Sequence, residues 1–190
     1  MRLPQLDHTA LTDGRATLYA DMKQGIEQNF KGFTAIDGNG DLVGPWNPWL
    51  TFDKFGGPVW ELVKALAQKP ELDGTVREVA ILVTGAHFHS EYELYAHIHI
   101  AESRGLSDDQ IRTIISGNRP ADLSATESLA YDFATVLVTG KIVPEFLYRQ
   151  MIDMFGQGGT AELIYLVGLY CMVSTTLNGF KVPLPEDGDD

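Results

Sequence analysis

The densest group of chemically active side chains lies between Arg77 and His99, a segment that holds four of the five histidines of the chain. Glu93 and His97 are four residues apart, so on an α-helix their side chains are neighbours. A carboxylate beside an imidazole orients the ring and raises its basicity, which gives an acid–base couple that titrates near neutral pH. Glu78 joins the couple if its helix packs against the next one as a hairpin. We therefore predict a catalytic site formed by Glu78, Glu93 and His97.

Three further side chains are candidates for binding a substrate. Arg77, the neighbour of Glu78, can anchor a carboxylate, because a guanidinium group binds carboxylates through two parallel hydrogen bonds. Asn47 and Trp49 lie in the aromatic segment Gly44–Leu50 and can form the wall of a substrate pocket. Each has a structural alternative. Arg77 can form an ordinary surface ion pair, and aromatic side chains in a long loop can fix the loop to the core or to another subunit.

The catalytic trio also has structural alternatives. The sequence Thr75-Val-Arg-Glu78 has the pattern of a capping box, in which the glutamate accepts a hydrogen bond from the Thr75 backbone amide. Glu93 and His97 can be an ordinary pair on a helix surface. A metal site is possible because His89, Glu93 and His97 share one helix face. The two histidines would start about 12 Å apart along the helix, which disfavours one shared ion.

Helices must position these residues, because apolar side chains recur at helical spacing along most of the chain and no stretch alternates long enough to demand a sheet. A first helix is predicted to end near Phe30, and capping-box patterns begin at Ser107 and Ser124. Residues 31–52 are predicted to form a turn followed by an extended aromatic segment. The predicted fold is an all-α bundle, whose further helices span 58–69, 74–86, 88–105, 107–116, 124–139, 144–155 and 160–179.

The composition fits one globular domain over residues 1–190, because 44% of the residues are apolar. The formal net charge of −12 argues against nucleic acid or an anionic membrane as a partner, since both require a basic face. The longest apolar run, Leu163–Val173, is shorter than a membrane span of roughly 18 residues, and Met1–Arg15 has no secretory-signal pattern. We therefore expect a soluble, cytoplasmic protein. The single cysteine, Cys171, excludes dithiol chemistry.

Three motifs resemble those of the carboxymuconolactone decarboxylase family, which shares an all-helical fold with the alkylhydroperoxidase D proteins. The motifs are Arg77-Glu78-x-Ala80-Ile81-Leu82, Tyr92-Glu93-x-x-x-His97-x-x-x-Ala101 and Gly105-Leu106-Ser107. The resemblance covers about residues 53–185. It implies that residues 1–52, a helix and an aromatic loop, are an N-terminal extension. Four of the last five residues are carboxylates, so residues 186–190 are predicted to form an acidic tail. It also implies a homo-oligomer, commonly a trimer or hexamer.

The resemblance also bears on the chemistry. In the peroxidase branch of this fold, two cysteines occupy the positions of Ser90 and Glu93, so the resemblance implies that this chain is not a thiol peroxidase. The glutamate and histidine of that branch match Glu78 and His97, whereas Tyr92 and Glu93 look like the decarboxylase side of the family. Tyr92 thereby becomes a further candidate for holding the substrate.

These observations together predict a cofactor-free, lyase-type enzyme without a metal, which decarboxylates a small carboxylated or lactone-type molecule or moves a proton on it. His97 would shuttle the proton, Glu93 would orient the ring, and Glu78 would be a second acid–base group. Two alternatives remain open at this point. One is a non-catalytic, oligomeric helical module that binds a small ligand, and the other is a metal-dependent hydrolase or lyase whose ligands come from the histidine-rich segment.

Overall fold

The computed structural model describes residues 2–185, which fold into eight α-helices and a short 3₁₀-helix at His8–Ala10. The predicted all-α fold class is confirmed, and the predicted acidic tail, residues 186–190, lies outside the described residues. The α-helices are α1 (Asp13–Asn29), α2 (Trp46–Thr51), α3 (Asp53–Ala67), α4 (Gly74–Phe88), α5 (Glu91–Ser103), α6 (Asp108–Ile115), α7 (Ala125–Val138) and α8 (Glu145–Phe180).

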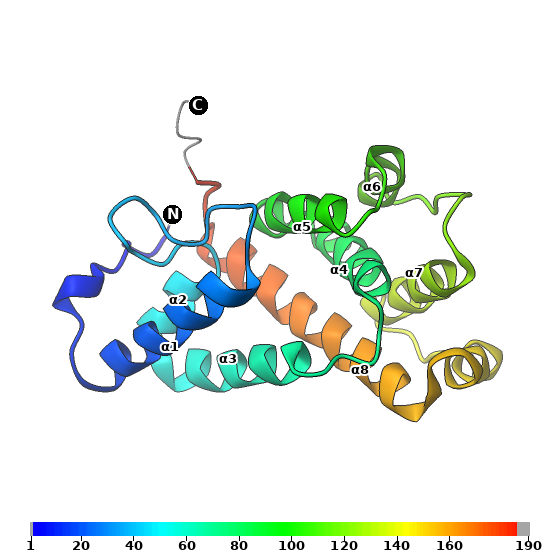
Figure 1. The fold of residues 1–190 in the computed structure, drawn as a ribbon, viewed down its shortest axis with the longest axis horizontal. Coiled ribbons are helices and arrows are strands. Elements are labelled where there is room, and N and C mark those ends of the chain that lie inside the picture. The colour runs from blue at the N-terminus through cyan, green and yellow to red at the C-terminus, as the bar shows by residue number, and fades with distance from the viewer. Residues whose placement is uncertain (1, 186–190) are drawn as a thin grey trace.

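Helix α8 lies at the centre of the fold and crosses Figure 1 diagonally, with α3 on one side and α4 and α5 on the other. One apolar cluster lies where α4, α7 and α8 meet, and it includes the fully buried Val79, Phe133 and Leu163. A second cluster joins α1, α2 and α3 to α5 and to the C-terminal half of α8, through residues such as Trp60 and Tyr92. The N-terminal segment therefore packs on two helices, α5 and α8, that also contribute to the first cluster.

Helix α8 has two helical parts that meet at Gly156, whose backbone is not helical (φ 67°, ψ −174°). A positive φ of this kind favours glycine, and the two parts match the helices predicted at 144–155 and 160–179. Among the described residues, α8 is the one helix whose length and composition would allow it to cross a membrane. Of its most apolar stretch of 18 residues, 39% is buried inside the protein. The apolar stretch is thus longer than the run Leu163–Val173 indicates, and its buried side forms the centre of the bundle.

The aromatic segment departs most from the predicted elements, because residues Trp46–Thr51 form α2 and are not extended. Pro45 is the N-cap residue of this helix and Pro48 lies in its first turn, where a missing amide hydrogen costs no intrahelical hydrogen bond. Helix α3 likewise begins at Asp53, before the start predicted from Pro58. Five of the six residues of α2 are buried, so packing stabilises a helix that is too short to form by propensity alone.

The contact between α2 and α3 depends on Gly56. A Cβ atom at this position would overlap the backbone carbonyl of Trp49, which cannot move aside as the end of a flexible side chain can. The adjacent Gly57 has no atom within 4 Å of its Cβ position. Gly56 therefore lets the two helices approach, whereas Gly57 has no such role.

The first prediction compares these neighbouring glycines. We expect Gly56→Ala to lower the free energy of unfolding by about 1–3 kcal/mol, because overpacking forces the two backbones apart. Gly57→Ala is the matched control and should leave stability unchanged or raise it by up to about 1 kcal/mol, since alanine favours a helix. Urea unfolding followed by tryptophan fluorescence measures both. Equal stabilities of the two variants would contradict the packing role of Gly56.

Candidate functional site

Helices α4 and α5 form a hairpin that brings together Glu78, Glu93 and His97. Glu78 projects from α4, and its Oε2 lies 2.7 Å from His97 Nδ1. Glu93 lies one turn before His97 on α5, and its Oε1 is 3.1 Å from His97 Nε2. The three side chains are buried, with exposed fractions of 1% for Glu78, 3% for Glu93 and 6% for His97. The structure thus places the imidazole ring between two carboxylates in the interior.

Two of the structural alternatives for these residues are wrong. The N-cap residue of α4 is Asp73, and the Glu78 carboxylate contacts His97 and Arg104 rather than capping the helix at Thr75. Glu93 and His97 are not a surface pair, because both are buried. The sequence around Glu78 cannot distinguish a glutamate that caps its own helix from one that contacts the next helix, since either would stand three residues after Thr75.

Arg104 is a site residue that the sequence analysis missed. It is the C-cap residue of α5, and its Nη1 lies 3.1 Å from Glu78 Oε1. The same nitrogen donates a hydrogen bond to the Gly74 carbonyl oxygen at the start of α4. Arg104 follows His97 by seven residues, which is two helical turns, so this spacing is the signal that could have revealed it. Glu78 is therefore shared by two cationic groups.

The charge state of His97 follows from this arrangement. Burial of the ring by itself lowers the pKa of His97, but the negative charges of Glu78 and Glu93 outweigh that effect and raise the pKa from 6.5 to about 10. At neutral pH His97 is then an imidazolium cation with a hydrogen on each nitrogen. The near-neutral titration predicted from the sequence is too low, because the i,i+4 spacing revealed one carboxylate and the fold supplies two.

The two glutamates make different contacts with the ring. His97 Nδ1 donates a hydrogen bond to Glu78 Oε2, whereas the Nε2 group and Glu93 Oε1 are close but not aligned for a hydrogen bond. Glu93 Oε1 is buried and has no hydrogen-bond partner among the described residues. Glu78 therefore fixes the orientation of the ring, whereas Nε2 is held by the ion pair with Glu93 without an aligned hydrogen bond.

His97 and Glu93 form part of the wall of a small apolar cavity with a volume of about 30 Å³, which is room for roughly two water molecules. The rest of this wall is mostly aromatic. Trp46 belongs to it, and its buried Nε1 has no hydrogen-bond partner in the described part of the chain. The wall of this apolar cavity thus contains an indole N–H donor and the ion pair of Glu93 and His97. The aromatic members are Phe30, Phe33, Trp46, Trp49, Tyr92 and Tyr170.

A larger cleft of about 240 Å³ lies on the Glu78 side of the ring. Arg77 and Arg104 line this cleft together with Glu78 and His97. It is more polar than the small cavity, and the two share part of their walls, including His97 and Tyr170. His97 therefore separates a charged cleft from an apolar cavity.

Tyr170, on α8, was not among the predicted site residues. Its ring meets the His97 ring edge to face, with 4.9 Å between the ring centroids. Burial, together with the nearby Glu93 and Glu78 carboxylates, raises the pKa of Tyr170 well above 10, so its hydroxyl stays protonated. Tyr170 is therefore a neutral phenol whose ring packs against His97 and lines both the small cavity and the cleft.

The four predicted substrate-binding residues have different surroundings. Trp49 lines the small cavity, and so does Tyr92, whose hydroxyl donates a hydrogen bond to the Thr34 carbonyl oxygen. Arg77 lines the cleft and forms an ion pair with Glu162. Asn47 lines neither space: its side chain accepts from the Leu6 amide and donates to the Pro4 carbonyl oxygen. The side chain of Asn47 thus fastens the N-terminal segment to α2.

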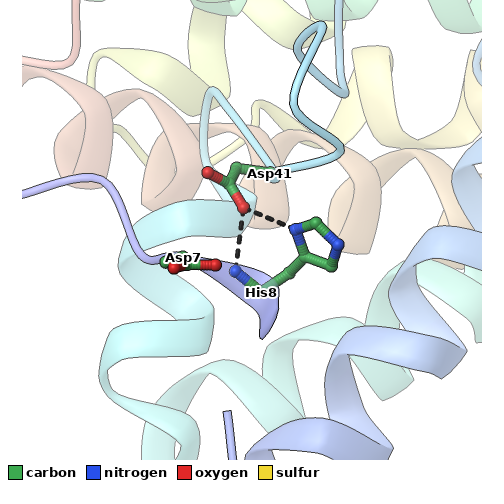
Figure 2. Close-up of side chains that lie close together, drawn as sticks. All are labelled: Asp7, His8 and Asp41. Atoms are coloured by element: carbon green, nitrogen blue, oxygen red, sulfur yellow. Dashed lines mark hydrogen bonds and ion pairs between the residues drawn. The ribbon is translucent and has the colours of Figure 1, made fainter. Parts of the chain in front are cut away.

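Possible metal ligands lie elsewhere in the described part of the chain. His89 lines a separate cleft with His87, so its side chain does not share the wall that contains His97. Ligand-type atoms of Asp7, His8 and Asp41 come within 4.8 Å of one another (Figure 2). There, Asp41 Oδ1 accepts hydrogen bonds from the His8 backbone amide and contacts His8 Nδ1, each at 2.8 Å. These contacts attach the N-terminal segment to the loop that contains Asp41, which explains why the three side chains lie close together.

Comparison with known proteins supports the fold. No protein-family profile matches the chain, and no curated protein sequence matches it. Two crystal structures of the debrominase Bmp8 are similar to it, each with a TM-score of 0.69 and 13% sequence identity. One is the apo protein and the other a cysteine-to-alanine variant in complex with 2,3,4-tribromopyrrole. The alignments cover 92% of this chain and 90% and 89% of those chains, respectively.

At this level of identity the likeness shows the fold alone, which is all-α and alkylhydroperoxidase D-like. Because more than nine-tenths of this chain is covered, most of residues 1–52 has a counterpart in those structures.

The second prediction concerns the ionisation of His97. A folded-state pKa near 10, against 6.5 for the free side chain, stabilises the fold fully below pH 6.5 and loses this contribution as the pH rises through 10. We expect the melting temperature to fall between pH 7 and pH 10.5 more steeply for the wild type than for His97→Gln. Histidine NMR resonances report the pKa directly. A His97 that titrates below pH 7 would contradict the assigned charge state.

Proposed function

We propose that the chain is an enzyme that transfers a proton to carbon in a small molecule, and that decarboxylation of a carboxylated or lactone-type substrate is its reaction. The observation that carries this proposal is the position of the buried His97 ring between the carboxylates of Glu78 and Glu93, with His97 and Glu93 both in the wall of the small apolar cavity. A buried cation next to an apolar cavity is suited to a reaction that generates negative charge on the substrate.

In this mechanism the bond between the substrate carbon and its carboxylate breaks, and carbon dioxide leaves. The electron pair remains on the substrate as an enolate, which the His97 imidazolium and the Tyr170 hydroxyl stabilise. His97 Nε2 then donates its proton to the carbon, and solvent returns a proton to the ring. Electrostatic stabilisation and proton donation of this kind each lower the barrier to a reaction through an anionic intermediate.

The geometry favours an exchange of the roles that the sequence suggested for the two glutamates. Glu78 makes the aligned hydrogen bond to His97 and is itself held by Arg104, so Glu78 is the orienting group. Glu93 forms an ion pair with His97 but makes no aligned hydrogen bond to it, and it lies in the cavity wall, so Glu93 is the carboxylate positioned to accept a proton from a substrate. Proton donor and acceptor then come from the chain, and the proposed step involves no cofactor or metal.

Proton chemistry is favoured over thiol chemistry by the surroundings of the cysteine. Burial raises the pKa of the Cys171 thiol, which keeps it protonated at neutral pH. Ser90, at a cysteine position of the peroxidase branch, is buried at the start of α5 and is no nucleophile of that kind. Membership of the cysteine-less decarboxylase side of the fold family is part of the proposal.

The aromatic walls support a small, planar substrate. The similar crystal structure with 2,3,4-tribromopyrrole contains a ligand of that shape. A cavity of about 30 Å³ is too small for such a ring, so we propose that Phe30 and Phe33 move when the ligand enters. Phe30 and Phe33 belong to the connection between α1 and α2, and side chains in a connection move more readily than side chains inside helices.

The third prediction tests the function. A panel of small keto acids, carboxylated lactones and aromatic acids is incubated with the protein in D₂O, and NMR follows carbon dioxide loss and deuterium at carbon. We expect turnover of at least one class, with a loss of about 10²–10⁴-fold in His97→Gln and in Glu93→Gln. His99→Gln, an exposed neighbour on the same helix, is the control. Full turnover by both site variants would overturn the mechanism, and binding without turnover would favour a non-catalytic module.

We also propose that the chain forms a homo-oligomer through the exposed side of α8. No charged residue occurs from Leu163 to Phe180, although Tyr165 and Met172 are 62% and 39% exposed. An uncharged surface of this kind on a chain of net charge −12 suits contact with another copy more than contact with an anionic membrane. Gly168 lies on the same side, with open space around its Cβ position. A trimer or a hexamer is the assembly that we propose.

The fourth prediction tests this surface. Gly168→Arg places a charge on it without a clash inside the chain, and we expect the variant to sediment as a smaller species than the wild type. Gly14→Arg, which also enters open space but lies on α1, should leave the assembly unchanged. Analytical ultracentrifugation measures both. A monomeric wild type, or equal assembly of the two variants, would contradict the proposal.

A further inference from the structure

The cleft on the Glu78 side of His97 contains two arginines in different states. Arg77 pairs with Glu162, and both side chains are nearly buried. Glu162 also accepts a hydrogen bond from the Glu71 backbone amide, so this pair ties α8 to the start of α4. Arg77 is therefore committed to a structural contact, although the sequence had made it the candidate for binding a carboxylate.

Arg104 has more freedom. Its side chain is 38% exposed, against 12% for Arg77, and among the described residues its polar contacts, to Glu78 and to the Gly74 carbonyl oxygen, are made by one nitrogen, Nη1. An arginine carries five N–H donors in a fixed fork, so the Nε and Nη2 groups are available to a ligand in the cleft. Arg104 can thus bind a ligand without giving up Glu78.

The charges around the cleft balance one another. Glu162 balances Arg77, and Glu78 and Glu93 together balance Arg104 and the His97 imidazolium. Glu93 lines the small cavity and not the cleft, so Glu78 is the one carboxylate in the cleft lining, and it contacts Arg104 through a single nitrogen. The other guanidinium N–H groups suit a carboxylate ligand, whose two oxygens match their fork geometry.

The cleft is also connected to the proposed reaction site. It shares Phe30, His97 and Tyr170 with the wall of the small cavity, and much of the remaining lining is apolar. A ligand whose charged end lies at Arg104 can place an apolar ring against these shared residues. The ring then lies next to His97, where the proposed proton transfer takes place.

We infer that Arg104 forms an anionic subsite, which binds a carboxylate that the substrate keeps throughout the reaction and directs its apolar ring toward His97. This inference rests on the proposed function, because the bound ring is taken to be the part of the substrate that reacts. The substrate class is a small ring compound with one retained carboxylate. Arg104, rather than Arg77, is the group that recognises it.

The fifth prediction tests the subsite with an acid that is not turned over. Isothermal titration calorimetry compares benzoate with benzamide, which has the same ring but no charge. We expect the wild type to bind benzoate at least tenfold more tightly than benzamide, and Arg104→Gln to remove this preference while its affinity for benzamide stays the same. Unchanged benzamide binding shows that the variant is folded. Arg112→Gln, an exposed arginine on α6, is the control and should keep the preference.

Each result separates the subsite from the catalytic mechanism. A wild type that does not bind benzoate, or that binds both ligands equally, would overturn the subsite, as would an Arg104→Gln variant that keeps the preference. None of these outcomes involves turnover, so the dependence of any reaction on His97 and Glu93 is decided independently. Conversely, the preference for benzoate stands as a property of the cleft even if the two site variants retain full turnover.

Discussion

The buried ion pair between Glu78 and His97 is the interaction on which the site depends. Removing two charged groups from water is costly, and the cost is offset here because each group has further partners: Arg104 contacts Glu78, and Glu93 lies beside His97. The four residues carry two negative and two positive charges. Loss of one member would leave a buried charge unpaired, so the spacing of α4 and α5 and the charge state of His97 are coupled.

The N-terminal segment completes the site that this ion pair occupies. Phe30, Phe33, Trp46 and Trp49 form one side of the small cavity, and the opposite side comes from α5 and α8. The loop between α1 and α2 is held down by the Tyr92 hydroxyl at the Thr34 carbonyl and by hydrogen bonds at its far end. Because these walls are mostly apolar, the charges inside act on one another and on a ligand more strongly than they would at a surface.

Local patterns predicted much of this architecture. The capping boxes at Ser107 and Ser124 are present, since such a motif is satisfied within four residues. The spacing of Glu93 and His97 fixed their contact for the same reason, because a helix makes i and i+4 neighbours whatever surrounds it. Helix α2 escaped prediction because it is only six residues long and gains its stability from the burial of Trp46 and Trp49.

The sequence by itself thus determined that helices form, where most of them begin, and that an acid–base couple lies on one of them. Only the tertiary structure decided that Glu78 reaches His97 and does not cap its own helix, that Arg104 joins the pair, and that Arg77 is committed to Glu162. It also decided the charge of the ring, because a pKa depends on burial and on every charge nearby. Contacts within one helix follow from spacing, whereas contacts between helices and the shielding from water exist only after packing.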